Sequence, residues 1–119
     1  MGVRRVVPNI ATSKLPESRA FYADVLGLTE AMDLGWIVTM VAPGFSGVHV
    51  SLLEQDETAS VQAQISIEVD DVDDVYDGAL RRGVPIVYPL TDEPWGVRRF
   101  FMADPNGMIL NILSHRPNE

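Results

Sequence analysis

The chain contains no cysteine, and this absence removes three kinds of chemistry at once. Disulfide bonds, thiolate metal sites and cysteine nucleophiles all require a thiol. The absence also fits a cytoplasmic location, where disulfides are rare. Histidine is nearly as scarce, since His49 and His115 are the only two in 119 residues. Neither has a carboxylate neighbour at metal-ligand spacing, so the histidines alone do not predict a metal site.

Positively charged residues are also few. Lys and Arg number 9 against 17 Asp and Glu, which gives a formal net charge of −8. Such a surface repels phosphate backbones, so we expect no nucleic-acid partner. No apolar run approaches the ~20 residues that span a bilayer, and residues 1–12 lack the features of a secretory signal. We therefore expect a soluble, cytoplasmic protein with no membrane partner, whose charge favours neutral or cationic ligands.

Two segments of the chain follow the same order of predicted elements. Each begins with a short β-prone run, at 6–12 and at 64–69, and a helical pattern follows each run. The first helix is predicted to begin near Pro16, to end at Gly27 and to bury four apolar residues, Ala20, Phe21, Val25 and Leu26. The second is predicted to be capped by Asp71, to end at Gly83 and to bury Val72, Val75, Tyr76, Ala79 and Leu80.

Three more β-prone segments follow each helix, at 28–32, 36–42 and 48–54 and again at 84–88, 97–103 and 108–114. Turn signals separate them, and the sharpest is Asp104-Pro105-Asn106-Gly107, because Asn-Gly readily takes positive φ. The sequence therefore predicts a single α+β domain over 1–119, built from two βαβββ repeats at 3–54 and 62–115 with a polar linker at 55–61. Neither half buries both faces of its sheet alone, so the halves must pack together or against another subunit.

Three motifs carry a resemblance to a known family. They are Val7-Pro8-Asn9-Ile10, the Ala-Phe-Tyr-Ala-Asp-Val-Leu-Gly-Leu run from Ala20 to Leu28, and Trp95-Gly96 followed by the Asp104–Gly107 turn. In these the chain resembles the vicinal oxygen chelate (glyoxalase/bleomycin resistance protein/dioxygenase) superfamily, and within it the bleomycin-resistance-like branch. The resemblance implies a U-shaped, partly closed, barrel-like sheet with a central cleft, commonly completed by a homodimer.

The resemblance also locates the positions at which enzymes of the family hold a divalent metal through His or Glu. In this chain those positions carry Val7, Ser51, Gln64 and Asn111. Valine has no donor atom, and a hydroxyl or a neutral amide is a weak ligand beside imidazole or carboxylate. We therefore expect no metal and no other cofactor. The two amides are expected to contact a ligand instead, with pairing to each other or to water as the alternative.

Other candidate site residues stand near these positions. Trp36 and Trp95 lie beside glycines at predicted strand starts, where two indoles can hold a planar or cationic ligand, although plain core packing is as good an interpretation. His49 shares a strand face with Ser51, and an ordinary half-buried histidine is the alternative there. Arg98 and Arg99 must point to opposite faces of a strand. We take Arg98 as the candidate contact for an anionic group of a ligand. The alternative is that both arginines balance the acidic surface.

The candidate ligand-binding residues are thus Trp36, His49, Ser51, Gln64, Trp95, Arg98 and Asn111. They predict a metal-free protein that binds a small molecule, as a protein that sequesters a drug or metabolite does. The alternative is a metal-dependent lyase, isomerase or dioxygenase of the same superfamily, finding its metal through His49 or a partner subunit. A third interpretation is a metal-independent enzyme with His49 or Tyr22 as acid or base. Whether the protein is an enzyme stays open, and catalytic residues are not assigned.

Overall fold

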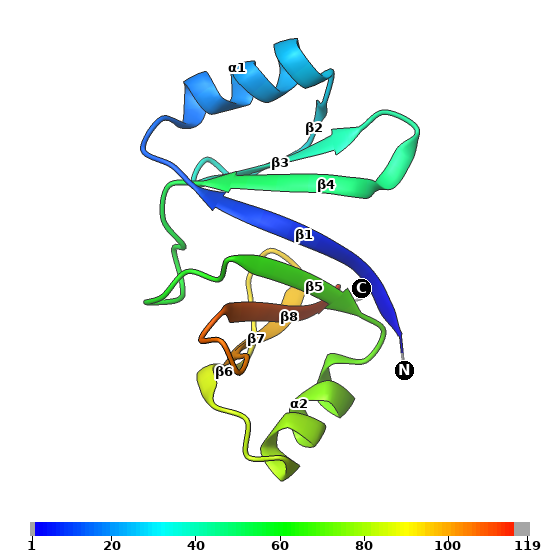
Figure 1. Ribbon diagram of the computed structural model, residues 1–119, viewed down its shortest axis with the longest axis vertical. Helices are drawn as coiled ribbons and strands as arrows, with labels where there is room; N and C mark the ends of the chain where they lie inside the picture. The colour runs from blue at the N-terminus through cyan, green and yellow to red at the C-terminus, as the bar shows by residue number, and fades with distance from the viewer. Residues whose placement is uncertain (1, 116–119) are drawn as a thin grey trace. The chain divides into compact units, whose positions relative to one another are not determined.

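The structure is a computed structural model that describes residues 2–115. Over these residues it has two helices and an eight-stranded mixed sheet that is not closed (Figure 1). The elements are β1 (Val3–Ala11), α1 (Leu15–Leu26), β2 (Thr29–Asp33), β3 (Ile37–Ala42), β4 (Phe45–Leu53), β5 (Ile65–Val69), α2 (Val72–Arg81), β6 (Ile86–Asp92), β7 (Val97–Ala103) and β8 (Ile109–His115). The strand order is β2-β3-β4-β1-β5-β8-β7-β6. This confirms the predicted α+β fold of two βαβββ repeats.

The described residues divide into two compact units. The N-terminal unit contains residues 7–62, and the C-terminal unit contains residues 2–6 and 63–115. Strand β1 contributes to both, because its later residues pair in parallel with β4, as Asn9 with Ser51. Just before the strand, the Gly2 carbonyl accepts a hydrogen bond of 3.0 Å from the Asp70 N–H.

Neither helix within 2–115 is long and apolar enough to cross a membrane.

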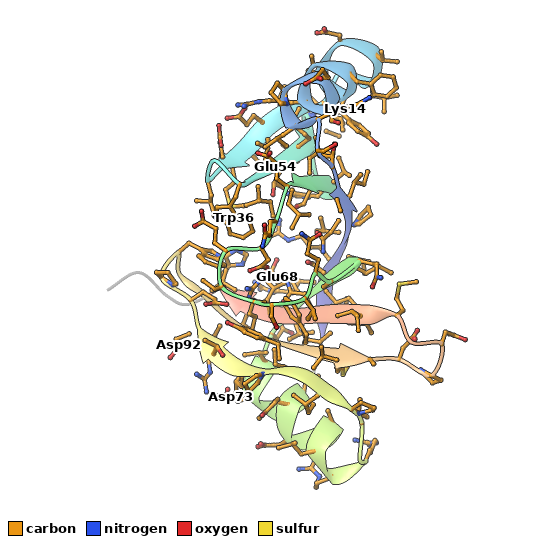
Figure 2. The ribbon with its side chains drawn as sticks, turned by 90° about the vertical axis from the view of Figure 1, so that its left-hand side faces the viewer. Lys14, Trp36, Glu54, Glu68, Asp73 and Asp92 are labelled. Atoms are coloured by element: carbon orange, nitrogen blue, oxygen red, sulfur yellow. The ribbon has the colours of Figure 1, made fainter. Side chains whose placement is uncertain are left out.

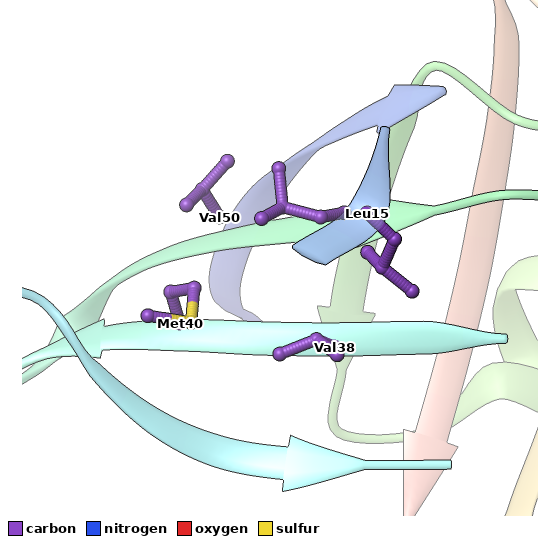
Figure 3. Packing of buried hydrophobic residues seen from close by; sticks show 5 residues of the cluster. Leu15, Val38, Met40 and Val50 are labelled. Atoms are coloured by element: carbon purple, nitrogen blue, oxygen red, sulfur yellow. The ribbon is translucent and has the colours of Figure 1, made fainter. Parts of the chain in front are cut away.

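The core of the N-terminal unit lies between α1 and strands β3 and β4. It consists of Leu15, Val38, Met40, Val50 and Leu52 (Figure 3). Tyr22 and Ala23 are partly buried and pack against this cluster. The predicted stripe of Ala20, Phe21, Val25 and Leu26 is wrong, because all four are exposed. Helix α1 carries apolar residues on both sides, so its pattern fits two phases. Leu15 and Tyr22 are seven residues apart and share the face that packs on the sheet.

The core of the C-terminal unit is formed by α2 on one face of β5, β8, β7 and β6. The predicted cap is confirmed, since the Asp71 carboxylate accepts from the Asp74 N–H at 3.2 Å. Val72 and Ala79 are buried, while Val75 and Tyr76 pack against them. The prediction for Leu80 is wrong, because 52% of that residue is exposed at the edge of the stripe. A one-sided amphipathic pattern therefore located this helix face almost completely.

The turn between β7 and β8 forms where the Asn-Gly signal predicts it. One oxygen of the Asp104 carboxylate accepts from the N–H of Asn106 at 2.8 Å and of Met108 at 2.9 Å. Gly107 has a φ of 80°, which only glycine adopts at little cost. These hydrogen bonds, that from Met108 first, hold the pKa of the Asp104 carboxyl below its ordinary value.

The two repeats can be aligned through their strand registers. Ile10 pairs with Leu52 in the first repeat, and Ile67 pairs with Ile112 in the second. Helix α1 begins five residues after Ile10, and α2 begins five residues after Ile67. This alignment matches Ser51 in the N-terminal unit with Asn111 in the C-terminal unit. The two positions therefore occupy equivalent points of the repeat, on the strand face away from the helix.

Candidate ligand-binding site

The sheet of the C-terminal unit has a second face, directed away from α2. Ile67, Phe100 and Ile112 pack with α2, so the alternate residues of the same strands occupy the other side. We call this the inner face and define it by Ser66, Glu68, Arg99, Phe101, Asn111 and Leu113. The registers set them in two rows, Ser66–Asn111–Phe101 and Glu68–Leu113–Arg99. In Figure 2, Glu68 lies on one side of these strands, and α2 with its residue Asp73 lies on the other.

A buried ion pair occupies one side of the inner face. Arg99 and Glu93 are 4% and 2% exposed, and the Arg99 Nε donates to a Glu93 oxygen at 2.6 Å. The Tyr88 hydroxyl donates to the same oxygen at 2.9 Å. The β6–β7 hairpin brings these groups together, since the Glu93 N–H bonds the Val97 carbonyl at 2.7 Å. A buried charge pair is tolerated only when its hydrogen bonds are made, and here they are.

Three aromatic rings surround the Arg99 guanidinium. Its central carbon lies 5.3 Å from the Tyr88 ring centroid, 5.2 Å from Trp95 and 4.8 Å from Phe101. Rings at this distance attract a cation through their negative faces. Arg99 therefore contacts both Trp95 and Phe101, and Phe101 is the strand neighbour of Asn111. This chain of contacts connects two of the predicted site residues, Trp95 and Asn111.

Asn111 presents an unsatisfied acceptor on the inner face. Its Nδ2 donates to the Ser66 hydroxyl at 2.9 Å. Its Oδ1 is buried and has no hydrogen-bond partner within the described part of the chain. Leaving a buried acceptor unpaired costs about 1–3 kcal/mol. The atom is therefore suited to receive an N–H or O–H from a ligand or from water.

Glu68 is the second buried carboxylate of the inner face. One of its oxygens pairs with Arg5 of β1, and the other lies 3.0 Å from the Nδ1 of His115. Burial by itself raises the pKa of the Glu68 carboxyl. The hydrogen bonds from Arg5 and then His115, with their charges, outweigh burial and hold that pKa below its ordinary value.

Arg98 and Gln64 point elsewhere. Arg98 donates to Asp73 of α2 at 2.8 Å and to Asp92 at 3.1 Å, hence lies on the helix side of the sheet. These two carboxylates raise its pKa. Gln64 is exposed, and its Oε1 accepts from the Ile109 N–H at 2.8 Å, so it closes the end of the β5–β8 pair. The neighbouring arginine, Arg99, is the one that enters the inner face.

The other three predicted residues belong to the N-terminal unit. Ser51 is buried, and its hydroxyl is hydrogen-bonded to that of Thr39 at 2.9 Å. His49 is half-buried and pairs across the sheet with Val41, on the strand face that Ser51 also uses. Trp36 is half-buried just before β3. The repeat alignment matches Leu53 with Leu113, and their strand partners are Ile37 and Arg99. Trp36, one residue before Ile37, is therefore equivalent to Arg98 and not to Trp95.

Sequence reasoning left Glu93, Tyr88 and Arg99 out of the site. Alternation alone places Arg98 and Arg99 on opposite faces, but Phe100 and Phe101 are both apolar and leave the phase of β7 undetermined. Glu93 stands in a turn, where carboxylates are ordinarily solvated. Only the fold shows that the hairpin carries it back over Arg99.

The residues that the family resemblance assigns to the metal positions do not suit a metal. Val7 has no donor, the Ser51 hydroxyl is engaged by Thr39, and the Gln64 oxygen is engaged by the Ile109 N–H. Only the neutral Asn111 Oδ1 remains without a partner in the described chain. Within residues 2–115, no group of three or more His, Asp or Glu side chains is arranged to hold a metal ion. The donor chemistry therefore argues against the superfamily's metal-dependent reactions here.

Comparison with known proteins agrees with this fold. A sequence model of the glyoxalase/bleomycin resistance protein/dioxygenase superfamily matches residues 4–112. No curated protein sequence matches the chain. A superfamily member from Vibrio splendidus 12B01 has 20% identity and a TM-score of 0.71, over 95% of this chain and 99% of that one.

Two further solved structures share the fold at similar identity. Methylmalonyl-CoA epimerase from Mycobacterium tuberculosis has 20% identity and a TM-score of 0.70, over 98% of this chain and 89% of that one. The Mn(II)-bound glyoxalase from Novosphingobium aromaticivorans has 22% identity and a TM-score of 0.65, over 98% of this chain and 41% of that one. At such identity the likeness shows the fold and not the activity.

Two paired βαβββ repeats define the class of protein, an α+β domain with a mixed, open sheet. The match over residues 4–112 then fixes the family: the chain belongs to the glyoxalase/bleomycin resistance protein/dioxygenase superfamily.

Proposed function

We propose that this protein binds a small organic molecule on the inner face of the C-terminal unit, without a metal, and acts by sequestering it. The observation that carries the proposal is the buried Asn111 Oδ1, which lacks a partner in the described chain. The family resemblance assigns this residue to a position where enzymes of the superfamily have a metal ligand. A neutral amide oxygen there serves a hydrogen-bond donor better than it serves a cation.

The surroundings indicate the chemistry of the ligand. Phe101 is the strand neighbour of Asn111, and Arg99 contacts both Phe101 and Trp95. Phe101 is 1% exposed, so the half-buried Trp95 is the ring of this pair that a ligand can contact. An aromatic surface favours a flat ring, which gains about 0.5–1.5 kcal/mol per well-placed aromatic contact. The net charge of −8 favours neutral or cationic molecules. We infer a planar ligand that carries an N–H or O–H donor.

A metal-dependent lyase, isomerase or dioxygenase is the alternative function. It requires strong ligands that Val7, Ser51, Gln64 and Asn111 do not supply. Elemental analysis of protein purified without chelators separates the two functions. We expect far less than one Mn, Fe, Ni or Zn per chain, and near-stoichiometric metal supports the alternative.

We also propose that the protein is a homodimer. The sheet is open, with β2 and β6 as its two edge strands. Helix α1 exposes Phe21, Val25 and Leu26, at 54%, 63% and 58%. Unpaired edges and exposed apolar side chains are features that association covers.

A fluorescence titration tests where a ligand binds. The probe is 2-aminobenzimidazole, which is planar, cationic at neutral pH and rich in N–H donors. The chain has two tryptophans, so Trp36→Phe and Trp95→Phe each leave one reporter. We expect saturable quenching in Trp36→Phe, because Trp95 reports on the inner face. Equal quenching of both single-tryptophan variants, or quenching confined to Trp95→Phe, contradicts the proposed location.

A further inference from the structure

The inner face also holds a carboxylate–imidazole pair that the binding proposal does not use. The His115 Nδ1 lies 3.0 Å from the Glu68 Oε2, and the other Glu68 oxygen is engaged by Arg5. The Glu68 side chain is 8% exposed, whereas that of His115 is 55% exposed. A buried, anchored carboxylate thus holds one nitrogen of a solvent-accessible imidazole.

The hydrogen bond fixes which imidazole nitrogen is available. An ionised carboxylate only accepts hydrogen bonds, so the His115 Nδ1 must carry the proton. In the neutral ring the lone pair is then on Nε2. A carboxylate behind Nδ1 also holds the ring in the orientation that leaves Nε2 open to take a proton. Arg5 keeps the Glu68 carboxylate in place, and Val97, the β7 partner of His115, adds no competing charge.

We propose that His115 is a metal-independent general base, with Glu68 as its positioning residue, and that it acts on neutral, activated acyl compounds. The −8 net charge of the chain disfavours anionic substrates. This proposal does not rest on ligand binding at Asn111. Four residues of a strand, roughly 13 Å, separate Asn111 from His115. The proposal for each site can therefore be contradicted without affecting the other.

The reaction uses water as the nucleophile. Nε2 of His115 takes a proton from a water molecule while the water oxygen forms a bond to the acyl carbon. The tetrahedral oxyanion then re-forms the carbonyl, and the bond to the leaving oxygen breaks. The leaving group departs as an alkoxide or phenolate, and the imidazolium returns its proton to solvent. The sum is ester plus water giving acid plus alcohol.

Nitrogen NMR tests the geometry in the wild-type chain. Long-range proton–nitrogen correlations of the neutral His115 ring, recorded in alkaline buffer, report which ring nitrogen is protonated. We expect the Nδ1–H form in the wild type and loss of that preference in Glu68→Gln. A dominant Nε2–H form in the wild type overturns the proposal, and this measurement does not depend on any variant folding.

Hydrolysis of 4-nitrophenyl acetate by the full chain tests the chemistry. General-base catalysis contributes about 100-fold at the low end of its range, so His115→Gln is expected to lose about that factor. Glu68→Gln is expected to lose about 10-fold or more, since the carboxylate orients the base. Glu57→Gln makes the same change of charge on an exposed linker residue and is expected to keep the wild-type rate. A His115→Gln rate equal to that of the wild type overturns the proposal.

Discussion

The guanidinium of Arg99 and the carboxylate of Glu93 form a hydrogen bond of 2.6 Å between two residues that are almost completely buried. Their desolvation is offset by the Tyr88 hydroxyl and by three aromatic rings around the cation. Removing either charge leaves the other buried without its partner. The pair is therefore a structural requirement of the inner face as well as a part of its surface.

We predict that Glu93→Gln lowers the free energy of unfolding by about 3–5 kcal/mol, because Arg99 stays charged and buried. Urea denaturation measures the change. The matched control is Asp73→Asn, which breaks the exposed pair with Arg98 and is expected to cost about 1 kcal/mol or less. Similar losses in the two variants contradict the burial of the Arg99–Glu93 pair.

The phase of α1 gives a second prediction. Leu15 is 6% exposed and Leu26 is 58% exposed. Leu15→Ala is expected to lower the free energy of unfolding by about 2–5 kcal/mol, and Leu26→Ala to change it by about 0.5 kcal/mol or less. The experiment is a pair of urea melts at low protein concentration. A larger loss in Leu26→Ala than in Leu15→Ala contradicts the observed helix face and supports the buried stripe predicted from the sequence.

Asp104 gives a prediction about acid stability. Its folded pKa is lowered by the Met108 and Asn106 N–H groups, so its contribution is complete above the unfolded value of about 3.9. That contribution is lost as the pH falls through the lower folded pKa. Asp104→Ala is therefore expected to unfold more easily than the wild type at neutral pH, with a difference that shrinks in acid. Thermal melts from pH 7 to pH 2 check this, and a difference that grows in acid has the wrong sign. Asp77→Asn, on the exposed side of α2, is the charge-matched control.

The proposed homodimer is checked by sedimentation equilibrium. We expect the mass of two chains, twice 13.1 kDa, at micromolar concentration. A stable dimer of this kind buries on the order of 1,200 Å² or more. A single-chain mass across that concentration range rules the dimer out.

The sequence contained most of the fold and less of the site. Strict alternation in β5, the Asp71 cap and the Asn106-Gly107 turn are local signals, and each appears in the structure where it was predicted. The α1 face was ambiguous because Phe21 and Tyr22 are adjacent and apolar, so either could face the sheet. Local pattern decides a helix face only when the other side is polar.

The site depends on contacts between residues far apart in the chain. Arg5 and His115 meet at Glu68 across separations of 63 and 47 residues, which no local pattern encodes. The choice between Arg98 and Arg99 required the phase of β7, and a one-residue slip reverses every side chain. Asn111 was found through the family resemblance, and its unpaired oxygen became visible only in the structure.

Calorimetric titration of 2-aminobenzimidazole into the wild-type chain, with and without EDTA, tests whether Asn111 binds a ligand without a metal. We expect the same Kd in both buffers. We also expect a Kd about tenfold weaker in Asn111→Leu, which removes the acceptor and keeps the side-chain size, because one hydrogen bond to a charged donor is worth about 1.5 kcal/mol. Binding that EDTA abolishes and added metal restores, or an unchanged Kd in Asn111→Leu, contradicts metal-free binding at Asn111.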